Sequence, residues 1–193
     1  MSTEPVSQLL LHAVNQGDLP QCQMLIQEGG ANVNFRNALG ESGLHIAAYR
    51  GQVSVAELLL GFGADPNVQQ LPRYGGRTPL HIAAVNNNLT LTTLLLQHDA
   101  DPNIQDAFGK VALHDAAVHG HLGMVRLLLT GGAAPDVPDD VQFTPWHYAK
   151  QKNFIEIVKI LPAKQDVSYA QRKEEAEKRL IWRQRKVAAP KRR

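Results

Sequence analysis

Apolar residues in this chain gather in short clusters that come in pairs, with polar stretches between the pairs. One cluster occupies 79–84, and a leucine run follows at 94–96. Gly76 suits the positive φ of a hairpin tip, Thr78 can cap a first helical turn, and Pro79 fits the first helical position. Two alanines in the first cluster allow close helix approach, and the leucine run supplies an apolar face. The pattern therefore predicts a turn, a helix, a tight loop, a second helix and an extended return.

This unit recurs with a nearly constant period. The histidine that follows the predicted helix start recurs at spacings of 36, 33 and 33 residues: His45, His81, His114 and His147. An apolar run follows each histidine, and the return Ala-Asp-Pro-Asn occurs at 64–67 and again at 100–103. One unit cannot cover its own apolar face, so the copies are expected to stack.

A 33-residue period with Thr-Pro-Leu-His, Ala-Ala, a leucine triplet and Gly-Ala-Asp-Pro-Asn resembles the ankyrin repeat family over roughly residues 6–161. The resemblance implies an all-α solenoid of helix pairs with projecting hairpin loops, which usually binds proteins and is not an enzyme. We expect a repeat domain at 1–162 and a basic helical tail at 163–193, with about five repeats at 6–34, 35–69, 70–105, 106–138 and 139–162.

The copies depart from the common pattern at identifiable places. The first repeat predicts helices at 6–16 and 19–27, with Met24, Leu25 and Ile26 on the buried side, and it looks like an N-terminal cap because it lacks the histidine. The hairpin at 70–76 carries about three extra residues, and such insertions map to loops.

Single substitutions also alter the helix starts. Gly43 stands in the proline position and should loosen the first turn, and Val111 cannot cap as threonine does, at a cost of about 1 kcal/mol. Gln142 replaces a hairpin glycine, which predicts a distorted turn, and Trp146 replaces a leucine. These departures from the repeat are where we expect function to lie.

Composition and charge limit the cellular locations and partners that we expect for this protein. The single cysteine, Cys22, fits a reducing compartment, no apolar run reaches the roughly 18 residues of a membrane span, and the N-terminus lacks signal-peptide features. We expect a cytoplasmic protein, with cytoskeletal and nuclear locations as alternatives, no membrane partner and no small-molecule substrate. The net charge of +2 hides an asymmetry, because residues 163–193 hold 11 Lys and Arg against 4 Asp and Glu, or +7, and residues 1–162 hold 9 against 14, or −5.

The chemistry-bearing residues do not suggest catalysis, a cofactor or a metal site. The resemblance gives the four motif histidines a structural role in bonding neighbouring loops, and one histidine per repeat lies about 10 Å from the next, too far to share an ion. His119 and His121 lack evident partners. Cys22 lies in a predicted apolar helix, so a packing thiol is favoured over a nucleophile.

A protein-binding surface has more specific support. Apolar residues precede the hairpin glycines or their equivalent, which is unusual for exposed tips, and they should form a partner-facing row: Leu39, Tyr74 with its neighbour Arg73, Phe108 and Val141. The alternative is that each tip folds back on its neighbour. Residues that follow the alanines of the first helices should add a concave surface of mixed chemistry: Tyr49, Arg50, Asn86, Asn87, His119 and Lys150.

The tail suggests a second kind of partner. Ser168 with Gln171 forms a capping-box pattern before a helix-favouring stretch. Its cations could neutralise RNA phosphates or an acidic protein surface such as a microtubule: Arg172, Lys173, Lys178, Arg179, Arg183, Arg185, Lys186, Lys191, Arg192 and Arg193. A solvated helix and a nuclear-import signal are the alternatives. The sequence thus predicts a non-catalytic adaptor or scaffold, and alternatively a structural subunit of an axonemal or ribonucleoprotein assembly.

Overall fold

The protein is described by a computed structural model over residues 4–163 of its 193 residues. Within that range it consists of α-helices, one short 3₁₀ helix and loops, without a β-strand. The helices run in chain order as α1 Glu4–Gln16, α2 Leu19–Gln27, α3 Gly43–Arg50, α4 Val53–Gly61, η1 Pro72–Tyr74, α5 Pro79–Val85, α6 Leu89–Gln97, α7 Ala112–Val118, α8 Leu122–Thr130, α9 Pro145–Gln151 and α10 Ile155–Ile160.

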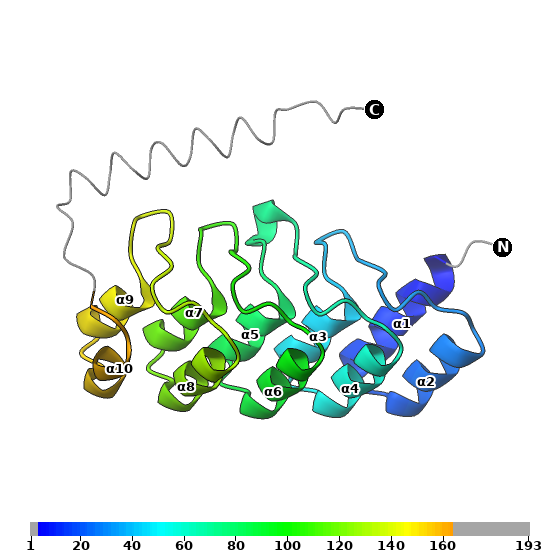
Figure 1. The fold of residues 1–193 in the computed structure, drawn as a ribbon. Coiled ribbons are helices and arrows are strands. Elements are labelled where there is room, and N and C mark those ends of the chain that lie inside the picture. Colours follow the sequence, from blue (N-terminus) through cyan, green and yellow to red (C-terminus); the bar gives the residue numbers. More distant parts are fainter. Residues whose placement is uncertain (1–3, 164–193) are drawn as a thin grey trace.

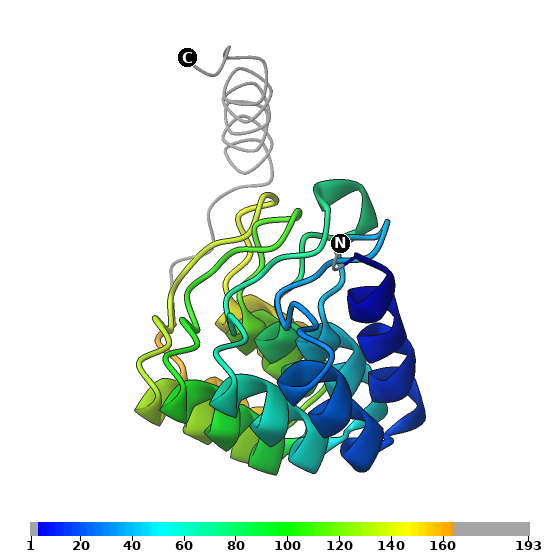
Figure 2. The same cartoon turned by 90° about the vertical axis from the view of Figure 1, so that its right-hand side faces the viewer.

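The helices form a stack of pairs. The inner helices α1, α3, α5, α7 and α9 pack in sequence on one another, and each also packs on its outer partner, α2, α4, α6, α8 or α10. Long hairpin loops join successive pairs and project from one edge of the stack (Figure 1), and the view along the stack shows all of them on the same side (Figure 2). The predicted all-α solenoid of the ankyrin type is therefore confirmed.

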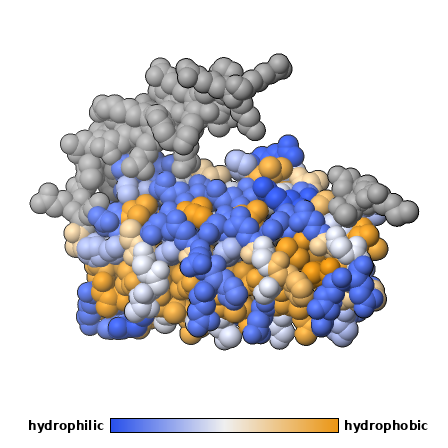
Figure 3. Space-filling view, turned by 45° about the vertical axis from the view of Figure 1, so that its right-hand side comes forward, coloured by the Kyte–Doolittle hydropathy of each residue, from blue (hydrophilic) through white to orange (hydrophobic). Residues whose placement is uncertain are grey.

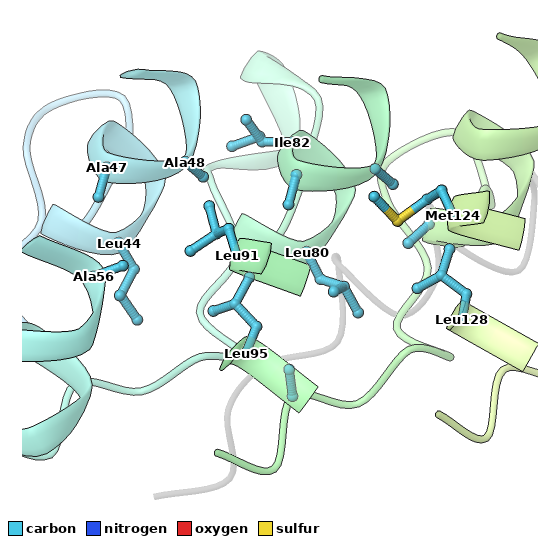
Figure 4. Close-up of a cluster of buried hydrophobic side chains, with 14 of the residues drawn as sticks. Leu44, Ala47, Ala48, Ala56, Leu80, Ile82, Leu91, Leu95, Met124 and Leu128 are labelled. Atoms are coloured by element: carbon cyan, nitrogen blue, oxygen red, sulfur yellow. The ribbon is translucent and has the colours of Figure 1, made fainter. Parts of the chain in front are cut away.

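The core is continuous from one repeat to the next. Leu80 of α5 and Leu95 of α6 lie between side chains of the preceding and following repeats, such as Leu44 and Leu128 (Figure 4), and all four are at most 2% exposed. The inner helices contribute mainly alanines at their contacts, so that neighbouring helices approach closely. Each repeat thus buries its apolar face only with the help of its neighbours.

The outer helix of the first repeat is only partly buried. Leu25 and Cys22 are buried, but Met24 is 49% exposed, so its predicted burial was wrong. Met24 occupies the position that Leu58 and Leu94 hold in later outer helices, and those two leucines are themselves only partly buried.

One expectation about an altered residue needs correction, and another stays a prediction. Helix α3 begins at Gly43, where a Cβ would lie only 2.9 Å from Leu59 Cδ1, and the loosening of its first turn stays a prediction. Gln142 adopts the left-handed conformation itself, with φ of 64°, and its amide donates to the Asp139 carbonyl at 3.0 Å, as the Gly109 amide does to Asp106 at 3.1 Å. The last hairpin is therefore not distorted at its tip.

None of the helices within residues 4–163 combines the length and apolarity that crossing a membrane requires. The predicted capping box at Ser168 and Gln171 and the basic tail helix lie outside the described residues.

Candidate protein-binding surface

The motif histidines hold the hairpins to the helices. In every repeat that carries the motif, Nδ1 accepts a hydrogen bond from the amide three residues earlier, at 3.1–3.2 Å. In three of them Nε2 donates to a carbonyl of the next hairpin at 2.9–3.0 Å: His45 to Arg77, His81 to Lys110 and His114 to Phe143. These bonds confirm the expected structural role.

His45 and His114 are held neutral by their surroundings. Burial lowers the pKa of His45 to about 4 and lowers the pKa of His114 as well. No group of three or more histidine, cysteine or acidic side chains that could hold a metal ion occurs in the part of the chain that the structure describes.

Polar side chains then fix the spacing between hairpins. Asn67 Nδ2 donates to the Asp99 carbonyl at 3.0 Å, while its Oδ1 accepts from the Asp101 amide at 2.7 Å. The same pair of bonds is made by Asn34 and Asn103 in their own repeats. Gln69 and Gln105 add a second set by donating to a carbonyl of their own hairpin and to one of the next. The hairpins therefore present their tips at a regular spacing.

The apolar tips are exposed to solvent. Leu39 is 38% exposed, Tyr74 46%, Phe108 60% and Val141 54%. Beneath the tips, an Asn or Asp side chain accepts from two amides of its own hairpin: Asn37, Asp106 and Asp139. The tips thus do not fold back into the core, and they stand on a hydrogen-bonded base.

Tyr74 is not in the same position as the other three tip residues. Backbone amides link neighbouring tips through the carbonyls of Leu39, Gly75 and Phe108, at 2.9–3.0 Å. Gly75 therefore occupies the repeat position, and the inserted residues lift Tyr74 onto the 3₁₀ turn η1, where Arg73 lies over its ring at 5.2 Å. The insertion replaces an in-line tip residue with a projecting Arg–Tyr pair.

The structure brings four of the predicted concave residues together. Tyr49, Arg50, Asn86 and Asn87 line a shallow depression with Leu89 and Thr90 at the ends of α3 and α5. Asn86 donates to the Ala48 carbonyl at 3.2 Å, and Arg50 donates to Asn15 Oδ1 at 2.9 and 3.1 Å. Asn87, with φ of 52°, ends its helix in the left-handed conformation. The polar groups of this depression are thus partly committed to the fold.

The other two concave residues lie elsewhere. His119 Nδ1 donates to the Asp115 carbonyl at 2.8 Å, and its ring stacks on His121 with the ring centroids 5.6 Å apart. The Lys150 ammonium lies 4.6 Å from the centre of the Trp146 ring. Trp146 itself is only 8% exposed, so it belongs to the core and not to a binding surface.

Sequence reasoning missed a charged row along the inner helices and hairpins. Asp115 is 4% exposed and lies 3.6 Å from an Arg77 guanidinium nitrogen. Lys110 lies 4.8 Å from the centre of the Tyr148 ring, and the Tyr148 hydroxyl donates to Asp139 at 2.6 Å. Burial first, and the Asp139 carboxylate next, raise the pKa of Tyr148, and burial raises that of Asp115. Asp115 and Tyr148 follow motif histidines at positions that hold isoleucine in other repeats, which is the signal that could have revealed them.

The remaining candidate for chemistry is a packing residue. Cys22 is fully buried, and burial raises the pKa of its thiol to about 11. A thiol with that pKa is a poor nucleophile near neutral pH. The ten predicted tail cations, from Arg172 to Arg193, lie outside the described residues.

Comparison with known proteins agrees with this architecture. The family model for ankyrin repeats (3 copies) matches residues 10–106 and 87–171. The chain is 37% identical over 79 residues to the ARF GTPase-activating protein GIT1 of Homo sapiens, and 34% identical over 79 residues to GIT2 of Mus musculus. These alignments cover 41% of this chain and 10% and 11% of those proteins, so the chain spans about a tenth of the relatives it matches.

Ankyrin repeats bind proteins and are typically not catalytic. The matched residues extend over most of the chain, and the histidine, asparagine and hairpin bonds above are those of stacked repeats. The chain belongs to the ankyrin repeat family.

Proposed function

We propose that this protein is a non-catalytic adaptor that holds a partner protein against its hairpin tips. The observation that carries the proposal is the exposure of an apolar side chain at each tip, from 38% at Leu39 to 60% at Phe108. Apolar anchors separated by polar side chains are the usual anatomy of a protein interface. On the face shown in Figure 3, hydrophobic residues are likewise interspersed among hydrophilic ones.

The inserted turn gives this surface its most distinctive feature. Tyrosine and arginine are enriched among the residues that dominate binding energy, and Arg73 with Tyr74 forms an exposed stacked pair. The GTPase-activating activity in the names of the relatives gives no support for that activity here, since this chain aligns with about a tenth of each.

The test compares two triple variants of the full chain as bait for partner capture. Leu39→Ser/Tyr74→Ser/Phe108→Ser should reduce capture at least tenfold, because each lost anchor costs about 1–2 kcal/mol of binding. The control is Met24→Ser/Phe62→Ser/Ile155→Ser, which removes equally exposed apolar side chains (49%, 41% and 56%) away from the tips.

Both variants should fold, since all six side chains are at least 38% exposed, and circular dichroism melting checks this. Partners that survive the tip variant and are lost with the control would place the binding surface elsewhere and refute the proposal.

A further inference from the structure

The charge of the four hairpins changes along the stack. From the first to the last, hairpins 31–42, 64–78, 100–111 and 133–144 carry net charges of 0, +1, −1 and −3. The last contains Asp136, Asp139 and Asp140 and no lysine or arginine. The hairpin edge is therefore neutral to positive at its N-terminal half and acidic at its C-terminal half.

Buried carboxylates deepen the negative charge at this acidic end. Asp106 and Asp139 are 3% and 1% exposed. The Oδ2 atom of Asp106 is buried and accepts no hydrogen bond from any described residue. Charges in such a low-dielectric setting are screened less than surface charges, so their field extends toward the hairpins above them.

The same two hairpins carry the most exposed apolar tips. Phe108 is 60% exposed and Val141 is 54% exposed, and a backbone bond of 3.0 Å from the Asp140 amide to the Phe108 carbonyl joins their hairpins. Acidic and apolar groups thus lie together on one surface, hairpins 100–111 and 133–144, which we call the acidic end.

Residues 164–193 combine basic and apolar residues, which complement the acidic and apolar groups of the acidic end. They hold 11 Lys and Arg against 4 Asp and Glu, a net +7, and include the consecutive apolar residues Leu180, Ile181 and Trp182. They follow directly on the last repeat, whose α10 ends at Ile160. Thirty residues reach about 45 Å as a helix and about 100 Å when extended, against about 10 Å between stacked helices, so the acidic end is within reach.

We propose that residues 164–193 dock in cis on the acidic end. The cations lie against the carboxylates of the last hairpin, and the apolar triplet covers Phe108 and Val141. Because the segment is tethered, its effective concentration at this surface is of millimolar order, so a contact too weak to form between separate molecules is populated here. The Leu39 and Tyr74 end of the tip row stays open for the partner, and partner contact at Phe108 requires release of the segment.

Zero-length carbodiimide cross-linking of the full chain tests this directly, since it joins lysine amines to nearby carboxylates. Links are expected from Lys173, Lys178 or Lys186 to Asp136 or Asp140. An equal mixture of ¹⁴N- and ¹⁵N-labelled protein separates the sources: docking in cis gives linked peptides of a single isotope, and docking on a second copy gives mixed pairs.

Two full-chain variants sharpen the test. Asp136→Asn/Asp140→Asn should lower the yield of tail links to the remaining carboxylates of the acidic end severalfold, as should 0.5 M salt. Glu28→Gln/Glu57→Gln removes the same charge from exposed positions in other repeats and should leave the yield unchanged. Asp139 is left intact because it organises its hairpin.

The absence of tail-to-hairpin links in the parent chain overturns the proposal, and so do mixed-isotope pairs alone or equal losses in both variants. The readout does not involve the partner. Failure of the tip variants to affect capture would therefore leave this result standing, and the reverse also holds.

Discussion

His45, His81 and His114 each bond the start of their own helix through Nδ1 and the next hairpin through Nε2. His81 accepts from the Thr78 amide at 3.2 Å and donates to the Lys110 carbonyl at 3.0 Å while only 1% exposed. A buried hydrogen-bonding group that loses its partner costs more than the bond itself contributed. The histidine is therefore expected to be among the most sensitive polar positions of each repeat.

Replacing His81 by alanine should lower the free energy of unfolding by about 2–4 kcal/mol, because two buried backbone groups lose their partner. The measurement is urea unfolding at pH 7. His98→Ala is the control, since His98 is exposed, and a change within about 0.5 kcal/mol is expected there. Equal effects at the two positions would contradict the structural role.

His45 predicts a pH dependence of stability. Its folded pKa, about 4, is below the ordinary 6.5, so the unfolded chain binds the proton more readily. This contribution is present in full above about pH 6.5 and is lost as the pH falls toward and through 4, with a total of about 3 kcal/mol. Urea unfolding between pH 7 and pH 4 measures it, and His45→Asn should flatten the slope in that window.

Among the motif helices α3, α5, α7 and α9, only α7 has no hydroxyl side chain at its N-cap, which is Val111. Thr78 and Thr144 place their hydroxyls 2.8 and 2.9 Å from the Nδ1 of their histidines, and the Thr78 hydroxyl also accepts from the His81 amide at 3.4 Å. Val111 keeps the backbone bond to His114 at 3.1 Å but has no hydroxyl. Helix α7 thus forms with the histidine bond but without a hydroxyl cap.

Val111→Thr should therefore stabilise the protein by about 0.5–1 kcal/mol, since the new hydroxyl has His114 Nδ1 as a partner in a site of the same shape. Thr78→Val is the matched reverse change and should destabilise by a similar amount. Thermal or urea unfolding compares the two, and a loss of stability with Val111→Thr would show that burial of the hydroxyl outweighs the cap.

In the hairpins, some features could be predicted from the sequence and others could not. The period, the helix starts and the exposed tips follow from local residue preferences that act alike in every copy. The position of Tyr74 does not, because the sequence gives the length of an insertion but not which residue returns to the repeat position; the structure assigns that to Gly75. The buried Asp115 and its Arg77 partner were missed for a similar reason, since their pairing crosses between repeats.

At the scale of the whole molecule, stacking converts each repeat position into a row of side chains. The burial of a residue therefore depends on its position in the repeat and on the repeats that pack on either side of it. Met24 is 49% exposed in the first repeat, whereas Leu58 and Leu94 at the same position of later outer helices are partly buried. The same apolar position is therefore covered to different extents in different repeats.

The hydrogen-bonded asparagines each join one repeat to the repeat that follows it. Asn34, Asn67 and Asn103 each donate to a carbonyl of the following repeat, and the next position in that series is Asp136. Pro138 likewise stands where Gln69 and Gln105 donate. Neither a carboxylate nor a proline side chain has an N–H to donate, so these asparagine and glutamine donors are absent where the fourth repeat meets the fifth. Asp136→Asn with Pro138→Gln would therefore extend the series of donors to the fifth repeat.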